Sequence, residues 1–434
     1  MNGATPALVA LAVVVYALGS ARLARSALSG TMLFTALGLL VGPEVFDLVD
    51  LTGLLGDSQF VSLLLTATLV IVLFTDAGAI NASNWRDDVL PARLLGIGLP
   101  LAILLGWVAA LALLGDLELW EAAVLAVMLA PTDAALGASV VSNPRVPSGI
   151  RQALNVESGL NDGIALPFFL VFLEAAEAVE SSLTVSDVVV TLVEEVGIAV
   201  AVGVAVGAFG ARGLRWAVRR RTADPDWLQI ALFGLAVVAY AFTTPLGGSG
   251  FIAAWVAGLV FGRSVRGHDK DSERLSLFAE TSGDVLTMLS FFVFGIFLGP
   301  VLTEVTWRNV VYAVVSLAVV RLAAVVVAMI GSGLRWPTLA YMGWFGPRGL
   351  ATIILTIEIV DESGMTGVST ISRTALLTVG LSVLLHGVTA WWGSNAYADL
   401  MATHPDGDPV AREQPSAVVR VPLRSRSRPG VFDR

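Results

Sequence analysis

The residues of this sequence that are best able to do chemistry are ionisable side chains inside long apolar stretches. A Glu-Ser-Gly-Leu-Asn-Asp run occupies residues 157–162, and a Pro-Thr-Asp triplet occupies residues 131–133. Asp76, Arg321 and Arg348 also fall within apolar stretches. An ionised side chain at the centre of a membrane-spanning helix costs roughly 2.5–3.5 kcal/mol on insertion scales. Such residues are rarely kept without a function, so they are the first candidates for a functional site.

The 157–162 run places its polar residues on one face of a helix. At 100° per residue they fall within about 140° of one another, in the order Glu157, Asn161, Ser158 and Asp162. We expect this polar stripe to face inward, away from lipid. Asp162 lies about nine residues into a span that we predict to begin at Ala153. That is roughly 14 Å along the helix axis, close to the centre of a bilayer.

A carboxylic acid at that depth has two useful properties. Removed from water, it holds its proton more tightly, so an Asp can stay protonated near neutral pH. Its carboxylate is also a hard oxygen ligand, suited to a small hard cation. One carboxylate that takes either a proton or a cation, and never both, is the minimal site of an antiporter. The Asp133 carboxylate, the Ser158 hydroxyl and a carbonyl freed near Thr132 would supply further oxygen ligands.

The composition excludes an ordinary soluble enzyme. Hydrophobic residues make up 56% of the chain and charged residues 14%, against about 25% charged residues in typical soluble domains. There is no cysteine, which excludes disulfides, thiolate metal sites and cysteine nucleophiles. The Gly-x-Ser-x-Gly and His-Glu-x-x-His motifs are also absent, which argues against an intramembrane hydrolase. We expect no enzyme activity, no cofactor and no nucleic-acid partner.

Apolar stretches of roughly 17–25 residues, long enough to cross a bilayer, recur thirteen times. The sequence therefore predicts an all-α integral membrane protein over residues 1–403, followed by a polar tail without fixed structure at residues 404–434. The predicted spans are Thr5–Ala21, Ser26–Pro43, Ser58–Thr75, Leu94–Gly115, Trp120–Val141, Ala153–Leu173, Val188–Ala211, two within Trp227–Gly262 divided at Pro245, Val285–Thr303, Asn309–Gly333, Pro337–Val360 and Thr374–Ala398.

The basic residues of the loops predict the orientation. Loops after odd-numbered spans hold sixteen Lys and Arg residues, and the opposite loops hold only Arg308 and Arg373. Cytoplasmic loops carry an excess of basic residues, so we expect the N-terminus outside and the tail in the cytoplasm. The first apolar stretch lacks a basic region before it, so we interpret it as a retained span.

Two spans are interrupted at corresponding positions. The stretch of sequence from Pro131 to Pro347 is nearly as long as that from Trp120 to Pro337, where their spans begin. Spans one to six thus correspond to spans eight to thirteen, and the single seventh span inverts the second repeat. Proline and the glycines of residues 343–349 should unwind both helices at mid-membrane, which is typical of transporter sites. Two simple proline kinks are the alternative.

The charges beside these two prolines have opposite signs. Asp133 follows Pro131, and Arg348 follows Pro347. Unwound helices expose half-helix ends, which carry partial charges of the helix dipole. We therefore expect Asp133 and Arg348 to compensate the exposed ends.

At these residues the sequence resembles the cation:proton antiporter superfamily, and within it the sodium/proton exchanger branch. The resemblance covers about residues 1–400. The matching motifs are residues 131–133, residues 157–163, Leu73–Ala77, Arg321 and Gly346–Gly349. It implies a prokaryotic antiporter of the inner membrane that crosses the bilayer many times.

The resemblance also implies roles for the site residues. Asp162 would be the main carrier of cation and proton. The cation site would be completed by Thr132, Asp133 and Ser158 and supported by Asn161. Glu157 and Arg321 would form a buried ion pair, alongside charge compensation by Arg348. Related electrogenic exchangers carry Asp where this chain has Asn161, so the resemblance implies an electroneutral exchange of one cation for one proton.

The implied fold has two parts that move against each other by alternating access. A core of about residues 92–174 and 309–398 would move against a dimerisation domain of about residues 5–80 and 188–303, in a homodimer. The sequence leaves Na⁺, Li⁺ and K⁺ open as the cation. A K⁺/H⁺ antiporter is therefore an alternative, as is a proton-coupled carrier of an organic solute, which would need a larger cavity with aromatic or paired basic groups.

Two residues have open interpretations. Relatives place the acid of the third span one residue earlier than Asp76, so its role at the site is undecided. His386 is the one histidine inside a predicted span. It is either a pH sensor or a packed, hydrogen-bonded side chain.

Overall fold

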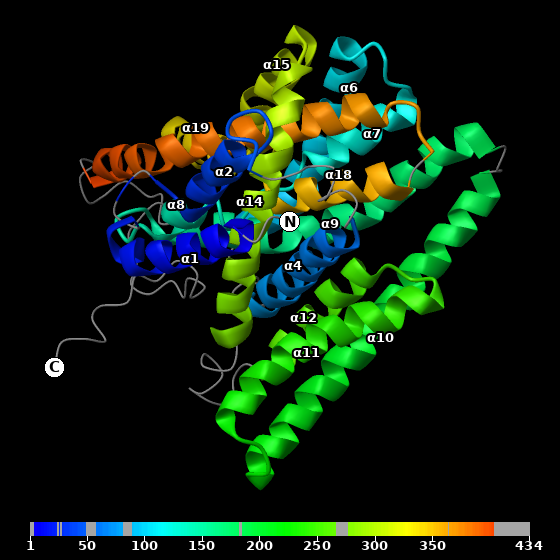
Figure 1. Cartoon of the computed structure of the whole chain (residues 1–434), viewed down its shortest axis with the longest axis vertical. Coiled ribbons are helices and arrows are strands. Elements are labelled where there is room, and N and C mark those ends of the chain that lie inside the picture. The colour runs from blue at the N-terminus through cyan, green and yellow to red at the C-terminus, as the bar shows by residue number, and fades with distance from the viewer. Residues whose placement is uncertain are drawn as a thin grey trace.

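The computed structural model describes residues 4–23, 26, 28–48, 58–80, 89–181, 185–265, 277–362 and 364–402. The predicted tail at residues 404–434 lies outside them. The regular secondary structure of the described residues is helical throughout (Figure 1). Eight of these helices are long and apolar enough to cross a membrane, and five further apolar helices are shorter. Together they correspond one to one with the thirteen predicted spans, so the predicted all-α membrane architecture is confirmed.

The helices of the first repeat and the linking helix follow the predicted order. They are α1 (Ala4–Leu23), α2 (Gly30–Val41), α4 (Ser58–Ala79), the continuous α5 (Val89–Arg93), η2 (Leu94–Gly98) and α6 (Leu99–Leu113), then α7 (Leu119–Met128), α8 (Ala138–Ser142), α9 (Ser148–Ser181) and the linking helix α10 (Val185–Arg220).

The helices of the second repeat follow the same pattern. They are α11 (Pro225–Thr243) with η3 (Thr244–Leu246), α12 (Gly250–Val265), α14 (Leu277–Thr303), the continuous α15 (Trp307–Val314), η4 (Val315–Val320) and α16 (Arg321–Ala328), then α17 (Trp336–Trp344), α18 (Leu350–Glu362) and α19 (Val368–Ala402).

Several helices are longer than their apolar stretches. α9 has 34 residues, about 51 Å at 1.5 Å per residue, whereas the hydrocarbon core of a bilayer is about 30 Å thick. The helix begins at Ser148, five residues before the predicted start of the span at Ala153, because a helix continues into polar sequence as long as its backbone bonds are made. Asp162 is the fifteenth residue of α9, still near the middle of the helix. α4 continues to Ala79, which places Asp76 inside its last turn.

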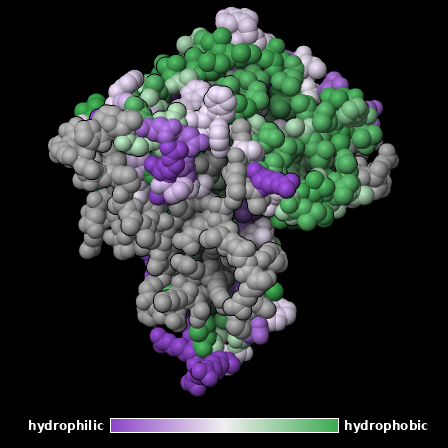
Figure 2. Space-filling model, turned by 90° about the vertical axis from the view of Figure 1, so that its left-hand side faces the viewer, coloured by the Kyte–Doolittle hydropathy of each residue, from purple (hydrophilic) through white to green (hydrophobic). Residues whose placement is uncertain are grey.

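The helices pack in two groups. α10 packs on α12, α12 on α4, and α14 on α2, whereas α6 packs on α7, α7 on α9, and α15 and α18 on α19. α9 and α18 also contact α4, so the two groups meet beside Asp76 and Asp162. Many outward side chains are apolar, including Leu18, Val193 and Phe209, which are 84%, 67% and 73% exposed. Figure 2 shows hydrophobic residues gathered over the top and right of the upper part, and hydrophilic residues at the lower tip and in patches near the middle. Broad hydrophobic surface of this kind suits a lipid environment.

Both predicted interruptions are present. α7 ends at Met128 and the helix resumes only at Ala138, while α17 ends at Trp344 and α18 begins at Leu350. The structure adds a second pair of irregularities, the π-helical segments η2 and η4, which begin at corresponding positions of the two repeats, Leu94 and Val315. π-helical turns often mark functional sites. The residues of η4 include no proline or glycine that would predict an irregular turn, so this segment was not predicted from the sequence.

Candidate functional site at the crossing of the two broken helices

The unwound segments 129–137 and 345–349 meet at the centre of the helix bundle. The N–H of Asp133 donates a hydrogen bond of 2.7 Å to the carbonyl of Pro347. Proline supplies no N–H of its own, so each segment contains a backbone position that cannot continue the helical ladder. The crossing therefore depends on side chains to pair the backbone groups that the two breaks release.

Asp133 caps the helix end of the other repeat. One carboxylate oxygen accepts the N–H of Leu350 at 2.7 Å, at the start of α18. The other accepts the N–H groups of Ala135 and Leu136 at 2.7 and 3.0 Å. Three backbone donors thus converge on a carboxylate that is 8% exposed. This is the arrangement that favours negative charge at a helix N-terminus, as the charge pattern predicts.

Arg348 caps the opposite end in return. Its side chain is fully buried, and Nη1 donates to the carbonyls of Ala130 and Pro131, the latter at 2.8 Å. The hydroxyl of Thr352 donates to the carbonyl of Met128 at 2.7 Å. These donors pair the carbonyls released where α7 ends, and the positive charge complements the negative end of the α7 dipole. The two repeats therefore cap each other.

Close packing at the crossing requires glycine. A Cβ built on Gly349 would fall on the carboxylate of Asp133, and one built on Gly346 would meet the Arg321 side chain and Thr132. With any larger residue at position 349, the carboxylate could not approach the start of α18. These glycines, predicted only to break the helix, therefore also provide room for the side chains of Asp133 and Arg321.

Glu157 and Arg321 form a buried ion pair. Nη1 donates to Oε1, and Nη2 donates to Oε2 at 2.7 Å. Both residues are only 2% exposed. Arg321 follows η4 directly, and Nη2 also lies 3.4 Å from the carbonyl of Met342 on α17. Two parallel bonds to a carboxylate are the strong geometry of arginine, so the pair links α9 to α16 and adds no net charge to the crossing.

Thr132, Ser158 and Asn161 form a connected polar cluster. The amide nitrogen of Asn161 donates to the hydroxyl and to the carbonyl of Thr132, at 2.7 and 3.3 Å. The hydroxyls of Thr132 and Ser158 lie 3.0 Å apart. Because the Thr132 carbonyl can only accept, the amide nitrogen of Asn161 must face it. The amide oxygen of Asn161 is then left buried with no hydrogen-bond partner among the described residues.

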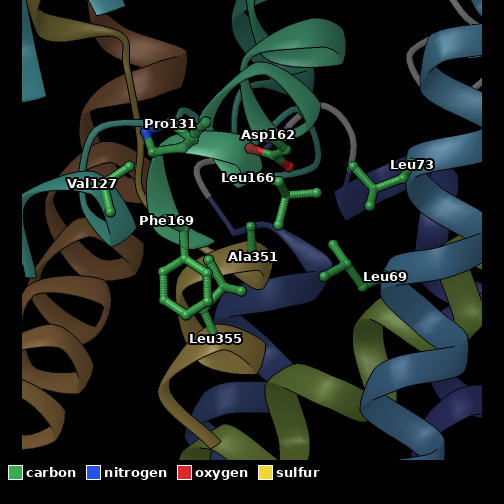
Figure 3. Close-up of a pocket in the computed structure, with 10 residues that line it drawn as sticks. Leu69, Leu73, Val127, Pro131, Asp162, Leu166, Phe169, Ala351 and Leu355 are labelled. Atoms are coloured by element: carbon green, nitrogen blue, oxygen red, sulfur yellow. The ribbon is translucent and has the colours of Figure 1, made fainter. Parts of the chain in front are cut away.

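Asp162 lies at the end of a small apolar pocket beside this cluster. Figure 3 shows its carboxyl group next to Pro131 and Leu166, and the other lining residues are Leu69, Leu73, Val127, Ala165, Phe169, Ala351 and Leu355. Within the part of the chain that the structure describes, its Oδ1 is buried without a hydrogen-bond partner. A buried carboxylate oxygen normally has a partner, so this atom is available to a proton or a cation.

The charges around Asp162 leave its own charge unmatched. Glu157 is neutralised by Arg321, and Asp133 and Arg348 carry opposite signs at the same crossing. The nearest charges that act on Asp162 belong to Asp133, to half-buried Asp76 of α4, and to Arg348. Among the described residues, no three or more His, Cys, Asp or Glu side chains cluster as a multidentate metal site would require. The hydroxyl, amide and carboxylate oxygens at this crossing suit a single monovalent cation instead.

Comparison with known proteins decides the family. A family model described as "Sodium/hydrogen exchanger, transmembrane" matches residues 9–392. The chain belongs to this family of exchangers. It is therefore a multi-pass membrane protein of a transporter family and not an enzyme, as the sequence predicts.

Individual relatives of this exchanger are distant. A probable Na⁺/H⁺ antiporter of Schizosaccharomyces pombe is 26% identical over 342 residues, which cover 74% of this chain and 44% of the relative. The K⁺/H⁺ antiporter NhaP2 of Shewanella sp. (strain ANA-3) is 24% identical over 372 residues, which cover 82% and 61%. The exchanger thus spans less than two thirds of the length of these curated relatives.

A solved structure shares the fold. That of the sodium proton antiporter MjNhaP1 from Methanocaldococcus jannaschii superposes with a TM-score of 0.74 at 20% identity. The superposition covers 90% of this exchanger and 98% of that chain. The predicted fold class, with crossed interrupted helices, is therefore confirmed.

The structure brings together all eight residues that the sequence singles out for the site, but it also shows two that sequence reasoning did not connect with it. Ser382 and His386 are both on α19: the hydroxyl of Ser382 accepts the N–H of Arg348 in the second unwound segment at 2.7 Å, and His386 packs against Trp344 at the end of α17. The sequence signal that could have pointed to Ser382 was the inverted repeat. Ser382 follows Asn161 by the same offset that separates the predicted span starts at Ala153 and Thr374.

Proposed function

We propose that this exchanger moves a monovalent cation, Na⁺ with Li⁺ or K⁺ as further candidates, in exchange for H⁺ by alternating access. Cation and proton compete for the Asp162 carboxylate. Thr132, Ser158 and Asp133 complete the cation site, and Asn161 supports it. The transported cation is a substrate, and no cofactor takes part.

One observation carries this proposal. The Oδ1 atom of Asp162 and the amide oxygen of Asn161 are both buried without partners in the described part of the chain, on adjacent residues of α9. The hydroxyls of Thr132 and Ser158 lie at the same crossing. Unsatisfied buried oxygens cost free energy, and either a proton on Asp162 or a small cation among these oxygens would offset that cost.

The charge balance supports an electroneutral exchange of one cation for one proton. Asp133 with Arg348, and Glu157 with Arg321, contribute no net charge whatever Asp162 does. Asp162 adds one negative charge when ionised, and this is cancelled equally by one proton or by one monovalent cation. The crossing then keeps the same charge in both loaded states, which avoids the cost of carrying a net charge through a low-dielectric region.

The two packing groups suggest how access alternates. We propose that the helices of about residues 92–174 and 309–398 move as a core against those of about residues 5–80 and 188–303. The second group would also form a homodimer interface. The loop arginines favour a cytoplasmic C-terminus, and the sequence as a whole favours a prokaryotic inner membrane.

The choice between Na⁺ and K⁺ is the finer question. The Schizosaccharomyces relative is named a probable Na⁺/H⁺ antiporter, and the Shewanella relatives are named K⁺/H⁺ antiporters. A K⁺/H⁺ exchanger is therefore the second candidate. An organic solute is less favoured, because the residues that line the described pocket at Asp162 include one aromatic and no basic side chain.

Asp162→Asn tests the proposal directly. The purified protein is reconstituted in liposomes with an internal pH dye, a pH gradient is imposed, and Na⁺, Li⁺ and K⁺ are added singly. An amide cannot carry the proton, so exchange should be abolished while the protein still folds and inserts. Asp116→Asn, at an exposed position, is the control and should keep full activity. pH-coupled exchange by the Asp162→Asn protein would refute the mechanism.

The competition also predicts a pH dependence for the wild-type protein. Each bound cation displaces one proton, so acidification should raise the apparent KM for the cation about tenfold per pH unit once Asp162 is mostly protonated. The maximal rate should change less than KM. A KM that does not vary with pH would show that cation and proton do not share the site.

A further inference from the structure

The second unwound segment is attached to α19 through two buried polar residues. The Ser382 hydroxyl accepts the N–H of Arg348 at 2.7 Å and lies 3.1 Å from Nδ1 of His386. Ser382 and His386 are 0% and 1% exposed. α17 ends at Trp344, and the centroid of its ring lies 5.2 Å from that of the His386 imidazole. The indole N–H of Trp344 donates to the hydroxyl of Thr389 at 2.9 Å. The whole segment from Trp344 to Arg348 is thus held against one face of α19.

The contact between Ser382 and Arg348 has a counterpart in the first repeat. In the first repeat the residue after the proline, Thr132, is held by the side chain of Asn161 on the following helix. In the second repeat the residue after the proline, Arg348, is held by the side chain of Ser382 on the following helix. Ser382 therefore occupies the place of Asn161. The first contact belongs to the cation site, and the second has no role in the exchange described so far.

We propose that Ser382, oriented by His386, is a positioning residue that holds Arg348 for the cation site. The proposal rests on the proposed exchange at Asp162. Arg348 is held at two points: Ser382 accepts its backbone N–H, and its guanidinium reaches across to the carbonyls of Ala130 and Pro131. Those carbonyls immediately precede Thr132. A displacement of the Arg348 backbone is therefore passed to the segment that carries the cation ligands.

The hydroxyl of Ser382 has two neighbours that set its direction. Oγ accepts the N–H of Arg348 and lies 3.1 Å from Nδ1 of His386. Nδ1 also lies 3.1 Å from the Ser382 carbonyl. A hydrogen on Nδ1 is donated to these oxygens, whereas a hydrogen on Nε2 leaves Nδ1 to accept from the hydroxyl. In both tautomers the ring is a hydrogen-bonding partner of Oγ, so His386 orients the serine.

The loss of Ser382 should affect the exchange through the cation ligands. If the Arg348 backbone is released, its guanidinium holds the carbonyls of Ala130 and Pro131 less well, and Thr132, which follows them, is displaced. The apparent KM for the cation should then rise more than the maximal rate falls. A loss of folded protein would instead lower the maximal rate and leave KM unchanged.

The first test is Ser382→Ala against Ser394→Ala in the full-length protein reconstituted in liposomes. Both serines are on α19, both are buried, and both make a hydrogen bond to another segment; Ser394 pairs with Tyr341 at 3.2 Å, away from the crossing. Ser382→Ala should raise the apparent KM for Na⁺ about tenfold and change the maximal rate less. Ser394→Ala should leave KM unchanged. An equal KM for the two variants would overturn the proposal.

The second test varies His386, in case Ser382→Ala does not fold. In His386→Asn the side-chain amide, which can donate or accept, takes the place of Nδ1 as the partner of the Ser382 hydroxyl, whereas His386→Leu removes that partner. The Asn variant should keep a KM near the wild-type value, and the Leu variant should behave like Ser382→Ala. If Asn and Leu have the same effect, His386 does not orient Ser382. A wild-type protein that exchanges no cation for protons would instead refute the proposed function.

Discussion

The two broken helices have the same architecture and opposite chemistry. Each is interrupted next to a proline, each is held by a side chain of the following helix, and each caps a helix end of the other repeat. The first break presents oxygens from Thr132 and Asp133. The second presents the Arg348 guanidinium and the glycines that make room for it. The inverted repeat therefore supplies a symmetric frame, on which one break carries candidate oxygen ligands and the other carries a compensating positive charge.

This division has a physical reason. Two acidic breaks at one crossing would repel each other and leave both helix ends poorly capped, and two basic breaks would offer no ligand to a cation. One acidic and one basic break cap each other, and together they add no net charge beside Asp162. Substitutions in the acidic break and in the basic break, made separately, test this division.

The largest effect should come from the ion pair that supports the second break. Arg321→Ala leaves Glu157 buried without its partner, which should lower the free energy of unfolding by about 3–5 kcal/mol. The double change Glu157→Gln with Arg321→Gln should recover part of that loss, because no charge is then left alone. Thermal unfolding of the detergent-solubilised protein measures both.

A matched control for this experiment is an exposed pair. Arg308 and Asp116 lie 3.8 Å apart with side chains 49% and 67% exposed, so Arg308→Ala should change stability by less than about 1 kcal/mol. A double mutant no more stable than Arg321→Ala would show that the buried pair is not what stabilises the core.

The next effect should come from the acidic break. In Asp133→Asn one carboxylate oxygen becomes an NH₂ group, which cannot accept the N–H of Leu350 or those of Ala135 and Leu136. We expect exchange to fall about 100-fold, while the proton-binding carboxylate of Asp162 is retained. Initial rates in proteoliposomes measure this, with Asp399→Asn at an exposed position as the control. Wild-type rates for Asp133→Asn would mean that the two breaks do not need opposite charges.

A smaller effect should come from the space that the basic break provides. Gly349→Ala places a methyl group against the Asp133 carboxylate, and overpacking of this kind costs about 1–3 kcal/mol. The apparent KM for the cation should rise together with the loss of stability. Gly96→Ala is the control, since a methyl group added there would meet no atom within 4 Å. If Gly349→Ala had no more effect than Gly96→Ala, the close approach would not be needed.

The smallest effect should come from the C-terminal tail, which belongs to neither broken helix. The tail at residues 404–434 is polar and rich in Arg and Pro, a composition that suits contact with anionic lipid more than a folded domain. Truncation after His404 should leave the exchange rate in vesicles largely unchanged. A large loss of rate in correctly inserted truncated protein would show that the tail takes part in exchange.

Much of the fold could be predicted because the bilayer imposes it. Apolar stretches of fixed length located the thirteen spans, and Pro131 and Pro347 located both breaks. The ends of α9 could not be predicted, because a helix may extend into polar sequence beyond the membrane. The π-helical segment η4 could not be predicted either, since its residues contain no proline or glycine that would mark an irregular turn.

In the candidate site, too, features set by neighbouring residues could be predicted, and contacts between distant residues could not. The sequence alone determined that Glu157, Ser158, Asn161 and Asp162 share one helical face, because helical periodicity depends only on the spacing of residues. It also determined that charges of opposite sign follow the two prolines. Pairings between residues far apart in the chain could at best be guessed from the repeat or from resemblance.

Only the tertiary structure decided which atoms meet. Asp133 caps α18, Arg348 caps α7, and Ser382 takes the place in the second repeat that Asn161 has in the first. The two capping contacts join one repeat to the other, and the contact of Ser382 joins two different helices of the same repeat. Their geometry depends on how two unwound segments cross within a few ångströms, and no local pattern encodes such a crossing. For that reason the sequence could name the candidate ligands, but only the fold could show how they are held.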